Sequence, residues 1–189
     1  IDDIDDILPG LLERCSRVFC TMGSHPEFDQ RLMGWVNELR AQARRGLHAP
    51  QEFVALDHLL HEMRLLKSRP ELEALRRAAA VTVGAHRRAF KAAAPGRTEY
   101  EIEAELLYEF HRHHGEAAYR PIVASGPNAC VMHHHATARE LREGELLLID
   151  AGCELDSYAA DVTRTCPVGG RFESRQRAVY EVVLEAQQA

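Results

Sequence analysis

The chain has 189 residues, 46% of them hydrophobic and 28% charged, with a formal net charge of −6 at pH 7. This length and composition are enough for a buried core, in one large domain or two small ones. The negative charge and the lack of a basic stripe argue against nucleic-acid binding. No apolar run approaches the roughly 20 residues that span a bilayer, so we also expect no membrane partner.

The cysteine content and the first residues of the chain indicate in which cellular compartment the protein is found. Five cysteines are odd in number and have no CxxC spacing, which argues against a disulfide framework or a zinc ribbon and favours reduced thiols. The segment 1–6 is acidic, whereas a secretory signal would be basic and then apolar. We therefore expect a cytoplasmic protein.

The first 67 residues predict a small α/β unit. Residues 4–12 indicate a short helix, and residues 16–22 indicate a strand. An amphipathic helix is expected next, with its apolar residues at helical spacing: Phe28, Leu32, Trp35, Val36 and Leu39. The pattern then changes near residue 68, where we place a domain boundary.

Two capping boxes follow this boundary. Ser68 and Glu71 predict the start of a long helix that ends near 95–96. Its apolar face is predicted to contain Leu72, Leu75, Ala79, Val83, His86 and Phe90. The second box, Thr98 with Glu101, predicts a helix that ends near residue 115 with three residues facing inward: Ile102, Leu106 and Phe110.

Two helices followed by strands are typical of an α+β domain. Residues 146–149 are wholly apolar and predict a buried strand that ends at Asp150. Residues 158–165 predict its hairpin partner, with Asp161 roughly opposite Asp150. A last helix is expected from Glu173 onward.

Two aspartates in this arrangement would have Cβ atoms about 4.5–5.5 Å apart and carboxylates on one face. Adjacent anions require either a shared proton or a cation, and hard oxygen ligands suit Mn²⁺ or Mg²⁺. We favour a metal site at Asp150 and Asp161. The spacing alone leaves a second interpretation open, in which both aspartates only terminate strands.

Three segments resemble one family of enzymes. Residues 146–154 followed by 158–167 resemble the first metal-ligand segment of aminopeptidase P, an Xaa-Pro aminopeptidase of the pita-bread metallopeptidases. Residues 125–133 resemble the segment that carries the substrate histidine of that family. Residues 61–73 are similar to the passage between its two domains. The three matches occur in the order that the family shows.

The resemblance implies an α+β chain of two parts. Residues 1–67 would be the C-terminal portion of an α/β creatinase-like N-terminal domain. Residues 68–189 would be the N-terminal half of a pita-bread domain. Such enzymes complete their dinuclear site with one histidine and two glutamates from later segments. We therefore expect an internal portion of a longer enzyme, which has no peptidase activity by itself.

The resemblance also implies roles for individual residues. Asp150 would ligate one of two divalent ions, expected to be Mn²⁺, and Asp161 would bridge both. The metal-activated hydroxide would attack the peptide bond that precedes a proline. His133 would contact the substrate, and Thr163 would orient a carboxylate, although an ordinary strand threonine is the alternative. Family members are often dimers or tetramers, so we expect a homo-oligomer.

Several questions stay open on the sequence alone. Alternation along an extended segment would place His133 and His135 on one face and His134 on the other. The family more often has an aromatic residue at the place of His134, and the roles of His134 and His135 are not assigned. Alternative functions are a prolidase, which cleaves dipeptides ending in proline, and a non-catalytic pita-bread domain that binds proteins. The presence of His133, Asp150 and Asp161 favours an enzyme.

Overall fold

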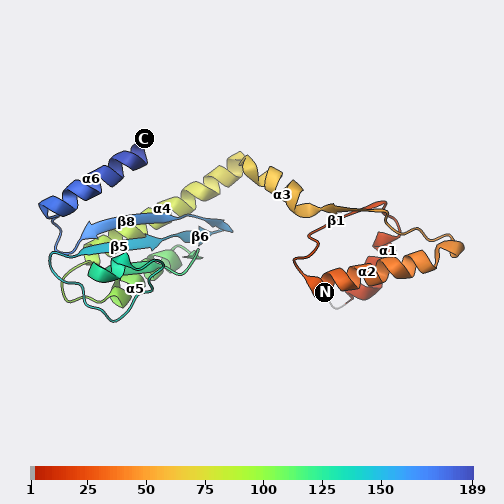
Figure 1. The fold of residues 1–189 in the computed structure, drawn as a ribbon, viewed down its shortest axis with the longest axis horizontal. Helices are drawn as coiled ribbons and strands as arrows, with labels where there is room; N and C mark the ends of the chain where they lie inside the picture. Colours follow the sequence, from red (N-terminus) through yellow and green to blue (C-terminus); the bar gives the residue numbers. More distant parts are fainter. Residues whose placement is uncertain (1–2) are drawn as a thin grey trace. The chain divides into compact units, whose positions relative to one another are not determined.

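The computed structural model describes residues 3–189 and divides into two compact units, with the boundary between Lys67 and Ser68 (Figure 1). Each unit has its own hydrophobic cluster. Within residues 3–189, no helix has both the length and the apolar character that crossing a membrane requires.

The first unit is a small α/β structure. Its elements are α1 (Ile4–Leu12), β1 (Arg17–Cys20), α2 (Pro26–Ala41), a 3₁₀ turn (Ala43–Arg45), β2 (Glu52–Ala55) and α3 (Leu56–Leu65). β1 and β2 pair in parallel. The predicted helices at 4–12 and around Trp35 are confirmed, whereas β2 and α3 were not predicted from the sequence.

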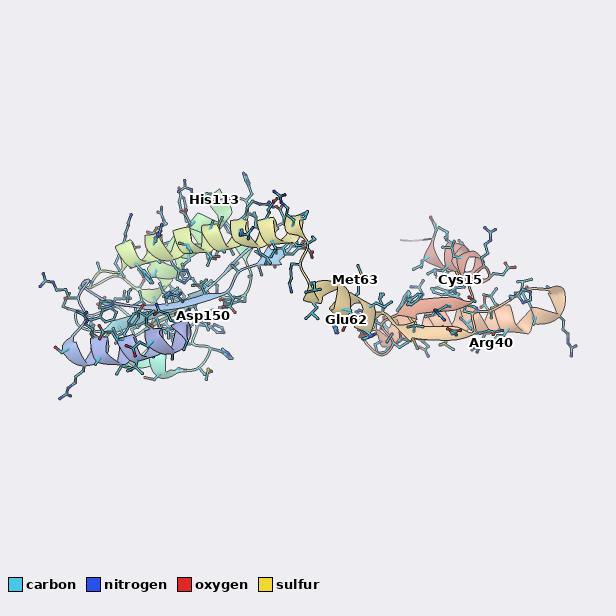
Figure 2. The ribbon with its side chains drawn as sticks, turned by 90° about the horizontal axis from the view of Figure 1, so that it is seen from above. Cys15, Arg40, Glu62, Met63, His113 and Asp150 are labelled. Atoms are coloured by element: carbon cyan, nitrogen blue, oxygen red, sulfur yellow. The ribbon has the colours of Figure 1, made fainter. Side chains whose placement is uncertain are left out.

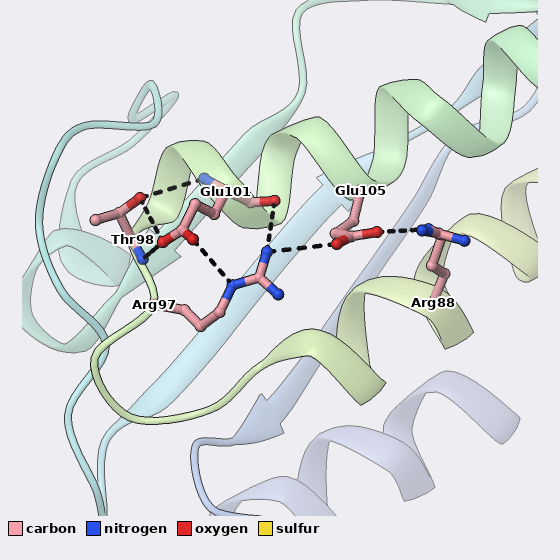
Figure 3. Close-up of polar contacts among 5 residues, drawn as sticks. All are labelled: Arg88, Arg97, Thr98, Glu101 and Glu105. Carbon is pink, nitrogen blue, oxygen red and sulfur yellow. Dashed lines mark hydrogen bonds and ion pairs between the residues drawn. The ribbon is translucent and has the colours of Figure 1, made fainter.

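The second unit begins with two long helices, α4 (Arg69–Ala92) and α5 (Glu99–Arg112). Both predicted capping boxes are present. At the second, the backbone N–H of Thr98 donates to Glu101 Oε2 at 2.7 Å, and Glu101 N donates to Thr98 Oγ1 at 3.3 Å (Figure 3). These contacts satisfy backbone groups that a helix leaves free at its start. Local sequence therefore determines where each helix begins.

Strands follow the two helices, as predicted. One antiparallel sheet has the order β4-β5-β8, formed by Ile122–Ser125, Leu146–Ala151 and Val162–Pro167. A second has the order β3-β6-β7, formed by Glu116–Ala117, Cys153–Leu155 and Tyr158–Ala159. A 3₁₀ helix, η2 (Gly126–Cys130), follows β4, and α6 (Ser174–Gln188) is the last element.

The buried face of α4 differs from the prediction. Leu72 and Val83 are 40% and 42% exposed, so the predicted face is wrong at these positions. The buried residues are mostly small: Ala74, Ala78, Thr82, Ala85, His86 and Ala89. Small side chains let α5 and the β-sheets approach α4 closely, and a search for large apolar residues does not detect such a face.

The inward residues of α5 are as predicted. Ile102, Leu106 and Phe110 are fully buried and belong to one cluster with the inner face of β5. That face comprises Leu147 and Ile149 together with Ala151. Because side chains alternate along a strand, the residues between them, including Asp150, lie on the opposite face. Asp150 therefore points away from α4 and α5.

Candidate metal centre

Asp150, labelled in Figure 2, is the fifth residue of β5 and lies, half-buried, on the face of the sheet opposite to the core formed with α4 and α5. The register places Thr163, not Asp161, directly opposite Asp150. Asp161 precedes β8 and is therefore a diagonal neighbour on the same face. The prediction that Asp161 lies opposite Asp150 was therefore wrong by two residues. Because side chains alternate between the two faces of a strand, a shift of two residues leaves Asp161 on the same face as Asp150.

Gly152 allows the chain to change sheets beside these aspartates. A Cβ atom at this position would lie 1.6 Å from the backbone oxygen of Ala160. The backbone also bonds across this point, since Ala160 N donates to the carbonyl of Cys153 at 2.9 Å. The close approach brings Asp161 back toward the end of β5. Glycine is required here by the lack of space, not by an unusual φ angle.

Tyr119 joins the two carboxylates. Its hydroxyl lies 2.6 Å from Asp150 Oδ1 and 2.8 Å from Asp161 Oδ1, and its proton can be donated to either. The two Oδ1 atoms are consequently no more than 5.4 Å apart, the sum of these contacts. The two aspartates expected at the site do converge.

Burial and the two neighbouring carboxylates raise the pKa of Tyr119 well above its usual range. The phenol is therefore neutral at physiological pH and acts as a hydrogen-bond donor. Sequence reasoning missed this residue. Tyr119 lies outside both the predicted helix and the predicted hairpin, and no periodic pattern marks it.

The carboxylates are suited to holding divalent cations. Hard oxygen donors bind Mg²⁺ and Mn²⁺, two ions in a dinuclear site lie about 3.5–4 Å apart, and Mg–O bonds are about 2.0–2.1 Å. The separation of Asp150 and Asp161 is compatible with these lengths. Among residues 3–189, however, no group of three or more His, Cys, Asp or Glu side chains is arranged around a possible metal position. Asp150 and Asp161 are thus the two candidate ligands that the described residues offer to such a site.

Within residues 3–189, the remaining candidate residues, His133 and Thr163, form no side-chain hydrogen bond with this pair. Thr163 is exposed and lies directly opposite Asp150, and in residues 3–189 its hydroxyl forms no hydrogen bond with a carboxylate. His133 is exposed in the loop after η2, with a positive φ of 52°. Its side chain has no hydrogen-bond partner within the described part of the chain. His134, in contrast, contacts the buried Glu99.

A groove opens beside the aspartates. Its volume is about 1000 Å³, and it lies between β8 and α6. Asp161, Thr163 and Thr165 line the side of the sheet, and Val179 and Val183 line the side of the helix. A substrate-sized molecule could therefore reach Asp161 from this side.

The sequence and the fold both match known proteins. Residues 73–189 match Metallopeptidase family M24. The chain belongs to this family. The match covers most of α4, all of α5 and α6, the two β-sheets of the second unit and both aspartates.

Individual relatives and solved structures similar to this chain are aminopeptidases. The Xaa-Pro aminopeptidase of Escherichia coli is 40% identical over 97% of the M24 chain, and that of Haemophilus influenzae is 48% identical over 68%. Among solved structures, the aminopeptidase PepP of Pseudomonas aeruginosa superposes with a TM-score of 0.95 at 52% identity and covers all of the chain.

The comparison also confirms the expected fold class. The M24 chain is an α+β segment of the aminopeptidase P architecture, with an α/β unit ahead of the pita-bread part. It spans 42% of the Escherichia coli enzyme, 30% of the Haemophilus influenzae enzyme and 43% of the Pseudomonas aeruginosa structure.

Proposed function

We propose that the full-length protein containing this chain is a metal-dependent aminopeptidase that releases the N-terminal residue from peptides with proline in second position. The convergence of Asp150 and Asp161 on the Tyr119 hydroxyl, in a member of family M24, carries this proposal. The relatives named Xaa-Pro aminopeptidase support the substrate class. Residues 1–67 would belong to the N-terminal domain and residues 68–189 to the catalytic domain.

The proposed site assigns a role to each residue. Asp150 and Asp161 would hold two divalent ions, which we expect to be Mn²⁺, with Asp161 bridging them. Bound ions would supply Lewis acidity and lower the pKa of water, which makes a hydroxide nucleophile available near neutral pH. The Tyr119 hydroxyl would hold the two carboxylates in one orientation. The Thr163 hydroxyl, on the neighbouring strand, would orient one carboxylate in the metal-bound protein.

His133 would contact the substrate. An imidazole beside the scissile carbonyl can donate a hydrogen bond to the oxygen on which negative charge develops. Its exposed position in the loop after η2 is consistent with contact to a bound peptide. The groove between β8 and α6 would admit part of that peptide.

The test is Mn²⁺-dependent hydrolysis of a tripeptide with proline in second position by the full-length protein. Replacing Asp161 by Asn should reduce kcat at least 10³-fold, because a shared ligand of both ions would be lost. Asp156→Asn is the matched control: it lies in the same hairpin, is exposed and pairs with Arg77, and its activity should stay within twofold.

The same assay separates the alternatives. Cleavage of Xaa-Pro dipeptides but not of tripeptides would indicate a prolidase. No hydrolysis with Mn²⁺, Mg²⁺, Co²⁺ or Zn²⁺ would contradict the proposal and favour a non-catalytic domain. For the 189-residue chain alone, we expect no activity, because two carboxylates do not hold a dinuclear centre. We expect the active protein to be a cytoplasmic homo-oligomer, which light scattering and cell fractionation would test.

A further inference from the structure

Glu99, the first residue of α5, has a completely buried side chain. Its Oε1 atom accepts hydrogen bonds from Ser125 N and Oγ at 2.8 and 2.9 Å and from Asn128 Nδ2 at 3.0 Å. Its Oε2 atom accepts from Thr137 N and Oγ1 at 3.0 and 2.8 Å and contacts His134 Nε2 at 3.0 Å. Burying a carboxylate is costly unless such partners compensate it.

These contacts keep the Glu99 carboxylate charged. Burial raises its pKa, but the hydrogen bonds from His134, Ser125, Asn128 and Thr137 outweigh burial and lower the pKa to about 2. An ionised carboxylate can only accept hydrogen bonds. The Nε2 atom of His134 must therefore carry a proton, and this hydrogen bond determines the orientation of the ring.

The partners of Glu99 lie on both sides of His133 in the chain. We call residues 126–137 the histidine loop. Between its anchored ends, Val131 N donates to the carbonyl of Asn128 at 3.0 Å, and His134 N donates to the carbonyl of Val131 at 3.3 Å. His133 itself is exposed and has a left-handed backbone conformation. Its position is thus determined by neighbours that Glu99 holds.

We propose that Glu99 is a positioning residue for His133, acting through His134 on one side of the histidine loop and Asn128 on the other. This inference rests on the proposed function, in which His133 contacts the substrate. It also assigns His134 as an anchor of the loop and not as a second substrate histidine. The adjacent histidines therefore have different roles, one exposed and one bonded to a buried carboxylate.

A double-mutant cycle tests the proposal in the full-length protein with Mn²⁺. Glu99→Gln is expected to lower kcat/KM for a proline-containing tripeptide at least tenfold. In a His133→Ala background the same substitution should cost less than twofold, because the histidine that it positions is gone. An equal loss in both backgrounds would overturn the proposal, since a purely structural role does not depend on His133.

Glu105→Gln is the matched control. It makes the same chemical change on the same helix, but its carboxylate accepts hydrogen bonds from Arg88 and Arg97 (Figure 3). Activity should stay within twofold. A loss as large as that of Glu99→Gln would show a general effect of removing a charge from α5, and would overturn the proposal.

A second pair of variants remains informative if Glu99→Gln does not fold. His134→Gln retains an N–H donor for Glu99, whereas His134→Ala does not. We expect activity within threefold for His134→Gln and at least a tenfold loss for His134→Ala. Equal losses in the two variants would contradict an anchor that acts by hydrogen bonding.

Amide hydrogen exchange separates this inference from the proposed function. If the wild-type protein cleaves no Xaa-Pro peptide, the proposed function fails, and exchange decides the positioning role. His134→Ala should then accelerate exchange at residues 131–135 at least tenfold and leave β5 and β8 unchanged. Unchanged exchange in the histidine loop, or uniform acceleration across the sheet, would overturn the inference.

Discussion

At the scale of single residues, the candidate metal centre depends on a side chain that no sequence pattern marks. Tyr119 brings Asp150 and Asp161 together by one hydroxyl. Without a cation between them, two carboxylates repel each other, and a neutral donor reduces this cost. Tyr119 therefore stabilises the geometry of the site in the absence of metal.

Replacing Tyr119 by Phe tests this role. The metal-free protein should lose about 1–2 kcal/mol of unfolding free energy, because hydrogen bonds to charged groups are removed. Urea unfolding in the presence of a chelator measures this. Tyr100→Phe, at an exposed tyrosine, is the control and should change stability by less than about 0.5 kcal/mol. Equal effects of the two substitutions would contradict the role of Tyr119.

The lowered pKa of Glu99 leads us to expect that the free energy of unfolding depends on pH. Its pKa falls from 4.5 to about 2 in the folded chain, so the unfolded state binds its proton first as the pH decreases. Its contribution, about 3 kcal/mol at most, is fully present above pH 4.5 and is lost as the pH falls toward 2. In the Glu99→Gln variant, the free energy of unfolding should therefore decrease less steeply as the pH falls below 4.5. Urea unfolding at pH 6, 4 and 3 measures this, and parallel curves for the two proteins would contradict it.

At the scale of elements, sequence signals located the starts of α4 and α5 but not the buried face of α4. Capping boxes act within four residues, so they can be recognised in the sequence. The alanine-rich face of α4 is buried because α5 and the β-sheets cover it, which is a tertiary effect. Ile102, Leu106 and Phe110 of α5 were predicted correctly because large apolar residues at helical spacing mark their own face.

The junction between β5 and β6 leads to a testable prediction at the scale of elements. Gly152→Ala would place a Cβ atom against the backbone of Ala160, which a flexible side chain cannot relieve. We expect a loss of about 3 kcal/mol or more, or failure to fold, because the strand must shift. Gly34→Ala, inside α2 with free space around it, should instead be neutral or stabilise the protein by up to about 1 kcal/mol. Thermal unfolding distinguishes the two.

At the scale of the whole molecule, the chain would contribute only part of the proposed metal site. In the proposed site Asp150 and Asp161 would be two oxygen ligands, and the described residues offer no cluster of three or more His, Cys, Asp or Glu side chains. The relatives that it matches are more than twice as long as the matched segment. A complete dinuclear site would require ligands from other parts of a full-length protein.

Metal binding tests this conclusion directly. We expect the 189-residue chain to bind Mn²⁺ weakly and the full-length protein to bind it tightly, because affinity rises with the number of charged ligands. Calorimetric titration measures both. Asp150→Asn should abolish the weak binding to the chain, whereas Asp156→Asn should leave it unchanged. Tight binding of two ions by the chain alone would contradict the assignment of an incomplete site.

The sequence by itself determined the class of fold, the start of each long helix in the second unit, and the choice of Asp150 and Asp161 as candidate metal ligands. These depend on local patterns: capping boxes, an apolar strand and motif spacing. Only the tertiary structure decided the register that sets Thr163 opposite Asp150, the convergence of the carboxylates on Tyr119, and the anchoring of His134 by Glu99. Each of these joins residues at least 13 positions apart in the chain. Such contacts arise from the way the strands and helices pack, which no local pattern encodes.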